Sequence, residues 1–313
     1  MITKSNIRYT GADLLTAVFP PIRYAVPGII PEGLTFFAAK PKMGKSMFAL
    51  STCRAIVTGG KALTNIQVSP GAALYISYED GPRRHQDRLR RMLRTGVVEG
   101  MEDLHTYYEW PRMGSGGLRQ IGDVANTLDN LKFVVIDTFQ IFRPKSPTGK
   151  YSYADDYGDV YAVKVAIERL GLSCLVLHHL RKAEAEDIMD TLNGSMGISG
   201  GVDSILALER KSSHDPKAVL HTTGRDIESA KYDLIFHPKT FEWEYVGKVG
   251  ATGSTECQTK ILTVLKATSK TLTPKQITDA TGENHEKVKK TLQRMASGGM
   301  VTSPAYGQYS APL

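Results

Sequence analysis

A short run of residues near the N-terminus has the spacing of a phosphate-binding loop. The run Ala39-Lys40-Pro41-Lys42-Met43-Gly44-Lys45-Ser46 lies between an apolar, strand-like segment (33–38) and a helix-like segment that begins at Met47. In such a P-loop, backbone N–H groups and a helix N-terminus bind phosphate, the lysine reaches the β- and γ-phosphates, and the serine hydroxyl holds Mg²⁺. Ala39 stands where the strict motif has glycine, and alanine disfavours a positive φ. The pattern predicts a nucleoside triphosphate site at Lys42, Met43, Gly44, Lys45, Ser46 and Met47.

Two acidic positions could supply the metal and water chemistry that triphosphate hydrolysis requires. Asp137 ends the apolar run 133–136, which is the arrangement of a Walker B acid that holds Mg²⁺ together with Ser46. Glu79, followed by Asp80, ends another apolar run, 73–78. Because parallel strands end at one edge of a sheet, we expect Glu79 to reach the attacking water as a general base. Helix capping is the alternative role for either acid.

A pair of histidines ends a further apolar run. In Leu175-Val176-Leu177-His178-His179, a histidine at the strand tip is placed to hydrogen-bond the γ-phosphate. Neighbouring residues in a strand point to opposite faces, which disfavours a metal site built from both histidines.

The order of the apolar runs predicts an α/β fold. Strand-like runs alternate with helix-length segments, the strands at 34–38, 73–78, 131–137 and 174–178 and the helices at 46–57, 85–94, 121–128 and 157–170. This alternation predicts a doubly wound, mainly parallel sheet. Four more runs follow in quick succession and predict antiparallel edge strands, at 204–208, 218–222, 234–237 and 241–246. We expect an N-terminal arm at residues 1–30, with a short helix at 11–17, and the α/β domain at 31–247.

The C-terminal part predicts a second, small domain. A Gly/Ser/Thr-rich linker at 248–255 precedes it, and the domain itself spans 256–313. Thr273-Pro274 can begin a helix, and a later helix would place Val288, Leu292 and Met295 on one face. With two short strands after it, this is a winged helix-turn-helix. The opposite face of its recognition helix is basic, and it either contacts DNA or is simply solvated; the residues are Lys287, Lys290 and Arg294.

Composition excludes some classes of protein and leaves the partner open. Apolar residues make up 41% and charged residues 23% of the 313, and the net charge is +7. The charge suits an anionic partner without requiring one. Three isolated cysteines argue against a disulfide framework or a zinc site. The sequence shows neither a signal peptide nor a membrane-spanning run, so we expect a cytoplasmic protein with no membrane partner.

In their order and spacing these motifs resemble the RecA-like ATPases, in particular the RepA-like branch of hexameric replicative helicases, relatives of the DnaB motor. The resemblance covers about residues 22–246 and includes the segments 194–203 and 224–226. It implies that Lys45 and Ser46 bind phosphate and Mg²⁺, that Glu79 is the catalytic carboxylate and that Asp137 is the Walker B acid. His179 would be the polar sensor. Arg225 would complete the site of a neighbouring subunit as an arginine finger, with Arg210 and Lys211 as alternatives.

The same resemblance implies two DNA-binding loops. The first, 143–153, mixes cations and aromatics, which suits phosphate contact and base stacking; its candidates are Arg143, Lys145, Lys150 and Tyr151. The second, 181–199, begins with Arg181 and Lys182, but its four acidic residues disfavour direct contact with phosphate.

The function that this resemblance implies is an ATP- and Mg²⁺-dependent hexameric helicase or translocase on single-stranded or forked DNA, in plasmid, phage or mobile-element replication. A separate primase or loader would assist it. Two alternatives stay open: a nucleotide-switched DNA-binding regulator or initiator without unwinding activity, and a filament-forming strand-exchange ATPase. The preference for ATP over other triphosphates comes from the resemblance alone.

Overall fold

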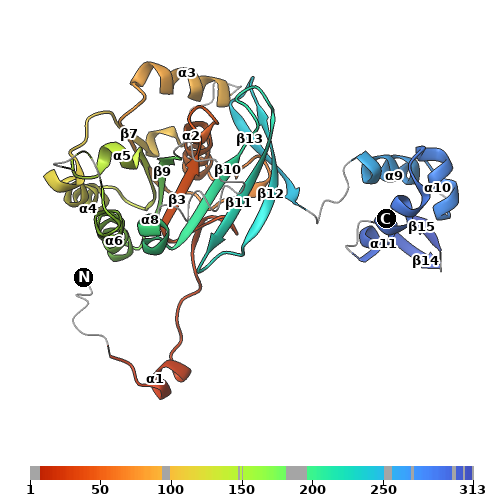
Figure 1. Cartoon of the computed structure of the whole chain (residues 1–313), viewed down its shortest axis with the longest axis horizontal. Helices are drawn as coiled ribbons and strands as arrows, with labels where there is room; N and C mark the ends of the chain where they lie inside the picture. Colours follow the sequence, from red (N-terminus) through yellow and green to blue (C-terminus); the bar gives the residue numbers. More distant parts are fainter. Residues whose placement is uncertain are drawn as a thin grey trace.

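The computed structural model of the chain describes residues 8–93, 99–146, 149, 151–180, 196–249, 256–268, 271–297, 301–305 and 307–311. Its centre is a 9-stranded sheet in the order β13-β12-β11-β10-β3-β9-β8-β6-β7. The parallel part consists of β3 (Gly33–Ala39), β6 (Ala72–Ser77), β7 (Leu104–Tyr107), β8 (Leu131–Asp137), β9 (Ser173–His179) and β10 (Ser204–Glu209). An antiparallel extension follows β10, made of β11 (Lys217–Gly224), β12 (Ala230–His237) and β13 (Glu242–Lys248). This confirms the predicted mainly parallel α/β sheet with antiparallel edge strands (Figure 1).

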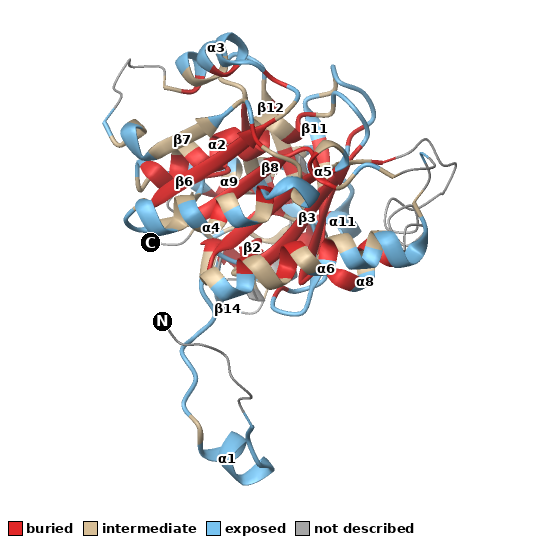
Figure 2. Ribbon diagram, turned by 90° about the vertical axis from the view of Figure 1, so that its left-hand side faces the viewer, coloured by how far each residue is buried: buried red, intermediate tan, exposed pale blue. Residues whose placement is uncertain are grey.

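Helices cover both faces of the parallel part. On one face α2 (Lys45–Val57) and α3 (Pro82–Met92) share a buried cluster with Phe37 of β3. On the other face a second cluster joins Phe36 to α4 (Gly117–Thr127), α5 (Phe139–Phe142), α6 (Tyr153–Leu170) and α8 (Met196–Gly201). Neighbouring strand residues thus face different clusters. Strands covered on both faces must be apolar throughout, which is why the central strands are red along their length in Figure 2.

Several short elements had no sequence signal strong enough to predict them. They are the hairpins β1 (Tyr24–Val26) with β2 (Ile30–Pro31) and β4 (Lys61–Ala62) with β5 (Ile66–Gln67), the edge strand β7, and two 3₁₀ turns at Met101–Asp103 and Met113–Ser115. Each is only a few residues long, so no apolar periodicity can develop within it.

The N-terminal arm carries α1 (Gly11–Thr16), where a helix was predicted. Thr10 and Asp13 form a capping box at its start. No residue of α1 is buried, and Figure 2 draws the helix as exposed over its whole length. Among the described residues, no helix combines the length and apolar character needed to cross a bilayer.

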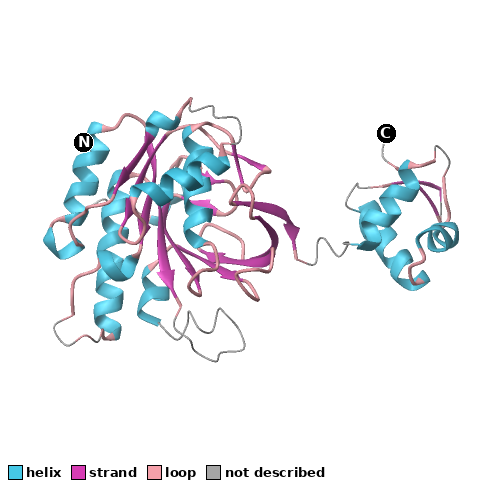
Figure 3. Ribbon diagram, turned by 90° about the horizontal axis from the view of Figure 1, so that it is seen from above, coloured by secondary structure: helices cyan, strands magenta, loops and turns pink. Residues whose placement is uncertain are grey.

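The C-terminal elements pack around a hydrophobic cluster of their own. They are α9 (Glu256–Lys266), α10 (Pro274–Thr281), α11 (His285–Ser297), β14 (Thr302–Ala305) and β15 (Gln308–Ser310), shown by type in Figure 3. Val288, Leu292 and Met295 are fully buried in that cluster, as their spacing predicted. Thr273 caps α10, again as predicted. The domain boundaries and the winged helix-turn-helix assignment stay predictions.

Candidate functional site

The carboxyl ends of four parallel strands bring the candidate catalytic residues to one edge of the sheet. In the register of the sheet, Ala39 pairs with His179 and Ser77 pairs with Asp137. Lys45 opens α2 directly after the loop that follows β3, and Glu79 follows β6. The sheet therefore gathers residues that lie up to 134 positions apart in sequence.

The P-loop has the backbone of a phosphate cradle. Lys42 has a φ of 63° and Gly44 a φ of 104°, so two left-handed residues turn the chain from β3 into α2. Ala39 lies before this turn, as the last residue of β3. A strand residue needs no positive φ, which explains how alanine replaces the glycine of the strict motif. The N-terminus of α2 has no side-chain cap, so its N–H groups remain available to an anion.

Lys45 is held inside this loop. Its ammonium donates to the carbonyls of Ala39 (2.9 Å) and Lys40 (3.2 Å), and the side chain is almost wholly buried. Burial lowers the pKa of Lys45 to about 8, although the nearby carboxylates of Asp137 and Glu79 oppose that shift. A buried, poorly compensated ammonium is well suited to bind phosphate oxygens.

Asp137 is buried at the end of β8 and has two hydroxyl partners. Tyr75 donates to its Oδ2 at 2.8 Å, and the Ser46 hydroxyl also hydrogen-bonds to the carboxylate. Burial raises the pKa of Asp137, while the bonds from Tyr75 and Ser46 oppose the rise. An aspartate paired with a P-loop serine is a suitable donor set for Mg²⁺, a cation that prefers oxygen ligands.

Glu79 and His179 form a contact across the site. Glu79 Oε1 accepts from the Thr138 hydroxyl at 3.2 Å and lies 3.2 Å from His179 Nε2. The other ring nitrogen, Nδ1, lies 3.2 Å from the Lys45 ammonium. A neutral imidazole protonated on Nε2 satisfies both contacts, because it donates to Glu79 and accepts from Lys45. His179 therefore links the P-loop lysine to the candidate general base.

Asp80 has a different environment from its neighbour. It is buried and forms ion pairs with Arg84 and Arg88 of α3, whereas the Glu79 side chain is 42% exposed. Of this acidic pair, only Glu79 contacts the residues of the site. Asp80 instead anchors the first turns of α3.

Arg225 lies far from the site of its own chain. Gly224 pairs with Ser204, and Ser204 pairs with Thr35 near the amino end of β3. Arg225 is exposed just beyond that point, at the edge of the sheet opposite the P-loop. It could complete a nucleotide site only in another copy of the chain.

Two of the predicted DNA contacts, Arg143 and Tyr151, have partners within the protein. Arg143 is 2% exposed and forms ion pairs with Asp156 (2.7 Å) and Asp159 (2.6 Å), and its guanidinium stacks on Tyr151. Tyr151 also donates to the Pro144 carbonyl. Both side chains therefore have partners within the protein, and the two acids of α6 hold the Arg143 guanidinium.

The other predicted contacts have varied positions. Lys145 and Lys290 are exposed, and Lys287 forms an ion pair with Glu283. Four further predicted contacts lie outside what the structure describes: Lys150, Arg181 and Lys182 as residues, and Arg294 as a side chain.

Known proteins share this family and this fold. A family model described as an AAA domain matches residues 3–185, more than half of the chain. The chain belongs to this family. One solved structure, described in its title as an ATPase domain, matches with a TM-score of 0.54 and 14% identity, over 68% of this chain and 84% of that one. A second, "The Structure Of A DnaB-Like Replicative Helicase And Its Interactions With Primase", matches with a TM-score of 0.56 and 14% identity, over 74% of this chain and 66% of that one. Comparison with curated proteins gave no sequence match.

The family match supports a P-loop ATPase, and the two solved structures share the RecA-like α/β fold of this chain. Sequence reasoning missed the hydroxyls that orient the two acids, those of Tyr75 and Thr138. Thr138 directly follows Asp137, which is a signal that could have been used. Tyr75 lies two residues before Ser77, the strand partner of Asp137, so only the register of the sheet reveals it.

Proposed function

We propose that this chain is an ATP- and Mg²⁺-dependent motor that works on single-stranded or forked DNA as a homo-oligomer, most simply a hexamer. One observation carries the proposal: Lys45, Asp137 and the Glu79–His179 contact meet around the P-loop. A metal bound there would neutralise charge on the β- and γ-phosphates.

Each residue has a distinct role in this proposal. Lys45 and the open N–H groups of α2 bind phosphate, and Tyr75 and Ser46 keep Asp137 oriented. Glu79 orients the attacking water and accepts its proton, while Thr138 fixes the carboxylate. His179 contacts both Lys45 and Glu79, so loss of the γ-phosphate would change its hydrogen bonds and affect the segment that follows β9.

Two features support a homo-oligomer. Arg225 lies too far from the P-loop of its own chain to act there, so its role as a finger requires a neighbouring copy. The N-terminal arm exposes a run of apolar side chains, with Leu15 90% and Val18 97% exposed. Apolar residues grouped on a short arm are typical of a segment that packs against a partner.

The replication role and its partners rest on the printed title of a structural relative. That DnaB-like helicase is described with primase, and we extend a separate primase or loader to this chain by analogy of fold alone. Replication of a plasmid, phage or other mobile element belongs to the same proposal, as does DNA contact by the C-terminal elements through Lys287, Lys290 and Arg294.

The test compares ATP hydrolysis with and without single-stranded DNA, together with particle mass in the presence of nucleotide and unwinding of forked duplexes. A motor should show stimulated hydrolysis, a mass of several chains and strand separation. A sequence-specific footprint without stimulation by generic single strands would favour the regulator. Open filaments in electron micrographs would favour the strand-exchange class, since head-to-tail contacts produce rings or filaments.

A further inference from the structure

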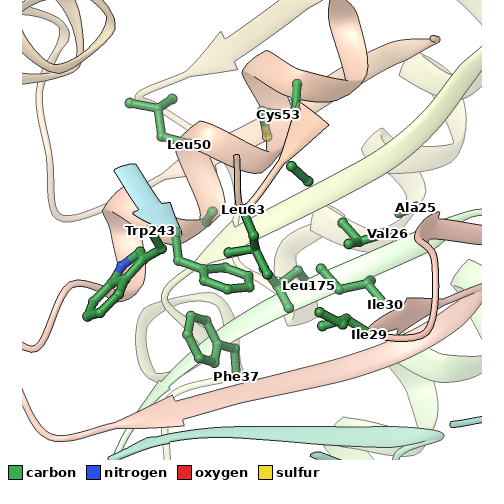
Figure 4. Close-up of a cluster of buried hydrophobic side chains, with 14 of the residues drawn as sticks. Ala25, Val26, Ile29, Ile30, Phe37, Leu50, Cys53, Leu63, Leu175 and Trp243 are labelled. Carbon is green, nitrogen blue, oxygen red and sulfur yellow. The ribbon is translucent and has the colours of Figure 1, made fainter. Parts of the chain in front are cut away.

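Two side chains that lie outside the P-loop motif hold the loop in place. Trp243 of β13 is fully buried, and its indole Nε1 donates to the Gly44 carbonyl at 3.2 Å. Arg210, directly after β10, donates from Nη1 to the Met43 carbonyl at 3.3 Å. Figure 4 shows Trp243 in the cluster that also contains Phe37 and Leu50, next to the start of α2. These contacts fix two consecutive peptide groups of the phosphate loop.

Fixing those carbonyls also aims the N–H groups of the same peptides. The Met43 carbonyl shares a peptide plane with the Gly44 N–H, and the Gly44 carbonyl shares one with the Lys45 N–H. In a planar trans peptide, the C=O and N–H bonds point in opposite directions. Carbonyls bound to Trp243 and Arg210 therefore turn the N–H groups of Gly44 and Lys45 away from these two side chains. N–H groups at this position of a P-loop are the ones that bind phosphate.

We infer that Arg210 and Trp243 are positioning residues that hold the P-loop in its phosphate-binding conformation. The inference rests on the proposed nucleotide-binding function and adds residues to it that no P-loop motif contains. Trp243 belongs to the antiparallel extension and Arg210 to the turn between β10 and β11, both far along the chain from residues 39–46. The extension thereby supports the phosphate loop as well as closing the edge of the sheet.

The packing around Arg210 and Trp243 fits this role. The Arg210 guanidinium lies 5.1 Å from the ring centre of Trp243 and 4.9 Å from that of Phe236, and it also donates to the Asp215 carbonyl. Arg210 is only 9% exposed, so it is not placed to reach the nucleotide of a neighbouring copy as an arginine finger would. A Cβ at Gly44 would lie 2.8 Å from Cζ2 of Trp243, so the indole packs directly on the loop backbone.

The chain offers a matched control for Trp243. Its other tryptophan, Trp110, is also buried and also donates from Nε1 to a backbone carbonyl, that of Gly117, at 3.1 Å. Trp243→Phe and Trp110→Phe therefore remove the same kind of hydrogen bond from the same kind of side chain. Only the first bond holds the P-loop.

The experiment measures the Kd of Mg²⁺ with a non-hydrolysable ATP analogue by calorimetry, and stability by urea unfolding, in the full-length chain. We expect Trp243→Phe to raise the Kd by about five- to tenfold, the effect of one lost hydrogen bond. Trp110→Phe should leave the Kd unchanged with a similar loss of stability. Arg210→Met should raise the Kd, and Arg210→Lys, which keeps a donor, should restore part of the affinity.

An equal Kd for the two tryptophan variants would overturn the inference. Absence of binding by the wild type would overturn the proposed function as well.

Tryptophan fluorescence gives a second test, in which the P-loop and its contacts with Arg210 and Trp243 are left unaltered. In Trp110→Phe the only remaining tryptophan is Trp243. Its emission should change on addition of the same analogue, with a midpoint equal to the calorimetric Kd. In Trp243→Phe the emission of Trp110 should stay constant. If the protein binds the analogue and the emission of Trp243 does not change, the indole is not coupled to the P-loop, and the inference fails.

Discussion

Glu79 and Asp80 are neighbours with the same charge and very different surroundings. Glu79 contacts His179 and Thr138 within the site, whereas Asp80 pairs with Arg84 and Arg88. We expect Glu79→Gln to lower the turnover of ATP by about 10²- to 10⁴-fold, the usual contribution of a general base, without weakening nucleotide binding. Asp80→Asn is the control, and it should reduce stability much more than turnover. Steady-state ATPase assays with calorimetric binding compare the two. An equal loss of turnover in both would reject Glu79 as the base.

Lys45 should make nucleotide binding depend on pH. Its pKa is lowered from the ordinary value of 10.5 to about 8, so between these values the folded apoprotein has lost a proton that the unfolded chain keeps. Stability of the apoprotein should therefore rise with pH in this window. Phosphate prefers the protonated lysine, so the Kd for ATP should rise above pH 8 by up to about tenfold per unit. Calorimetry in buffers of different ionisation enthalpy should detect proton uptake on binding. A constant Kd with no proton uptake would contradict this prediction.

At the residue scale, a functional residue can be predicted only if the residues next to it in sequence form a recognisable pattern. Lys45, Ser46 and Asp137 could be predicted because each belongs to a short local pattern. Tyr75 and Trp243 could not, because their contacts with Asp137 and Gly44 depend on strand register and on an extension 199 positions away. The ion pairs of Arg143 could not be predicted for the same reason, because its partners on α6 are visible only in three dimensions.

At the element scale, one buried ion pair joins three elements. Lys164 of α6 pairs with Asp203, which precedes β10, and the same carboxylate accepts the Leu34 N–H of β3 at 3.0 Å. Lys164→Met would leave Asp203 charged and buried, which we expect to cost about 3–5 kcal/mol of unfolding free energy. The double variant Lys164→Met/Asp203→Asn keeps an acceptor for Leu34 without a charge, and it should recover part of that loss. Urea unfolding measures both. A single variant as stable as the wild type would show that the pair has no structural role.

The elements themselves could be predicted where their signals are long or chemically specific. The four apolar runs became β3, β6, β8 and β9 because strands buried on both faces need uninterrupted apolar sequence. The start of α10 could be predicted from the Thr273 cap. Edge strand β7, Leu-His-Thr-Tyr, could not, because it is short and has no buried residue. This segment is a strand because it pairs with β6, and its own sequence does not indicate that pairing.

At the scale of the whole molecule, the N-terminal arm should control assembly. Leu15 and Val18 are 90% and 97% exposed on the arm, and we expect them to be buried against another copy in the oligomer. Replacing both by serine should lower the particle mass observed with nucleotide and leave ATP binding by the single chain unchanged. Serine at Val246 and Val249, which are 44% and 42% exposed, is the control. Mass photometry reads the outcome, and an unchanged mass in the arm variant would exclude the arm from the interface.

The proposed role of Arg225 can be tested only in an assembly of several copies of the chain. Lys45 lies at the carboxyl ends of the parallel strands and Arg225 lies near their amino ends, so a site that used both residues would combine the P-loop of one copy with the arginine of another. Lys45→Ala and Arg225→Ala should each lose most of the ATPase activity alone. In an equimolar mixture that exchanges chains, a site between an Arg225→Ala chain and a Lys45→Ala neighbour carries both native residues. Random mixing makes about one interface in four intact, so about a quarter of the activity should return, apart from cooperative effects. Each variant mixed with itself provides the background rate. If the mixture stays at that background although exchange is verified with labelled chains, Arg225 does not act between subunits.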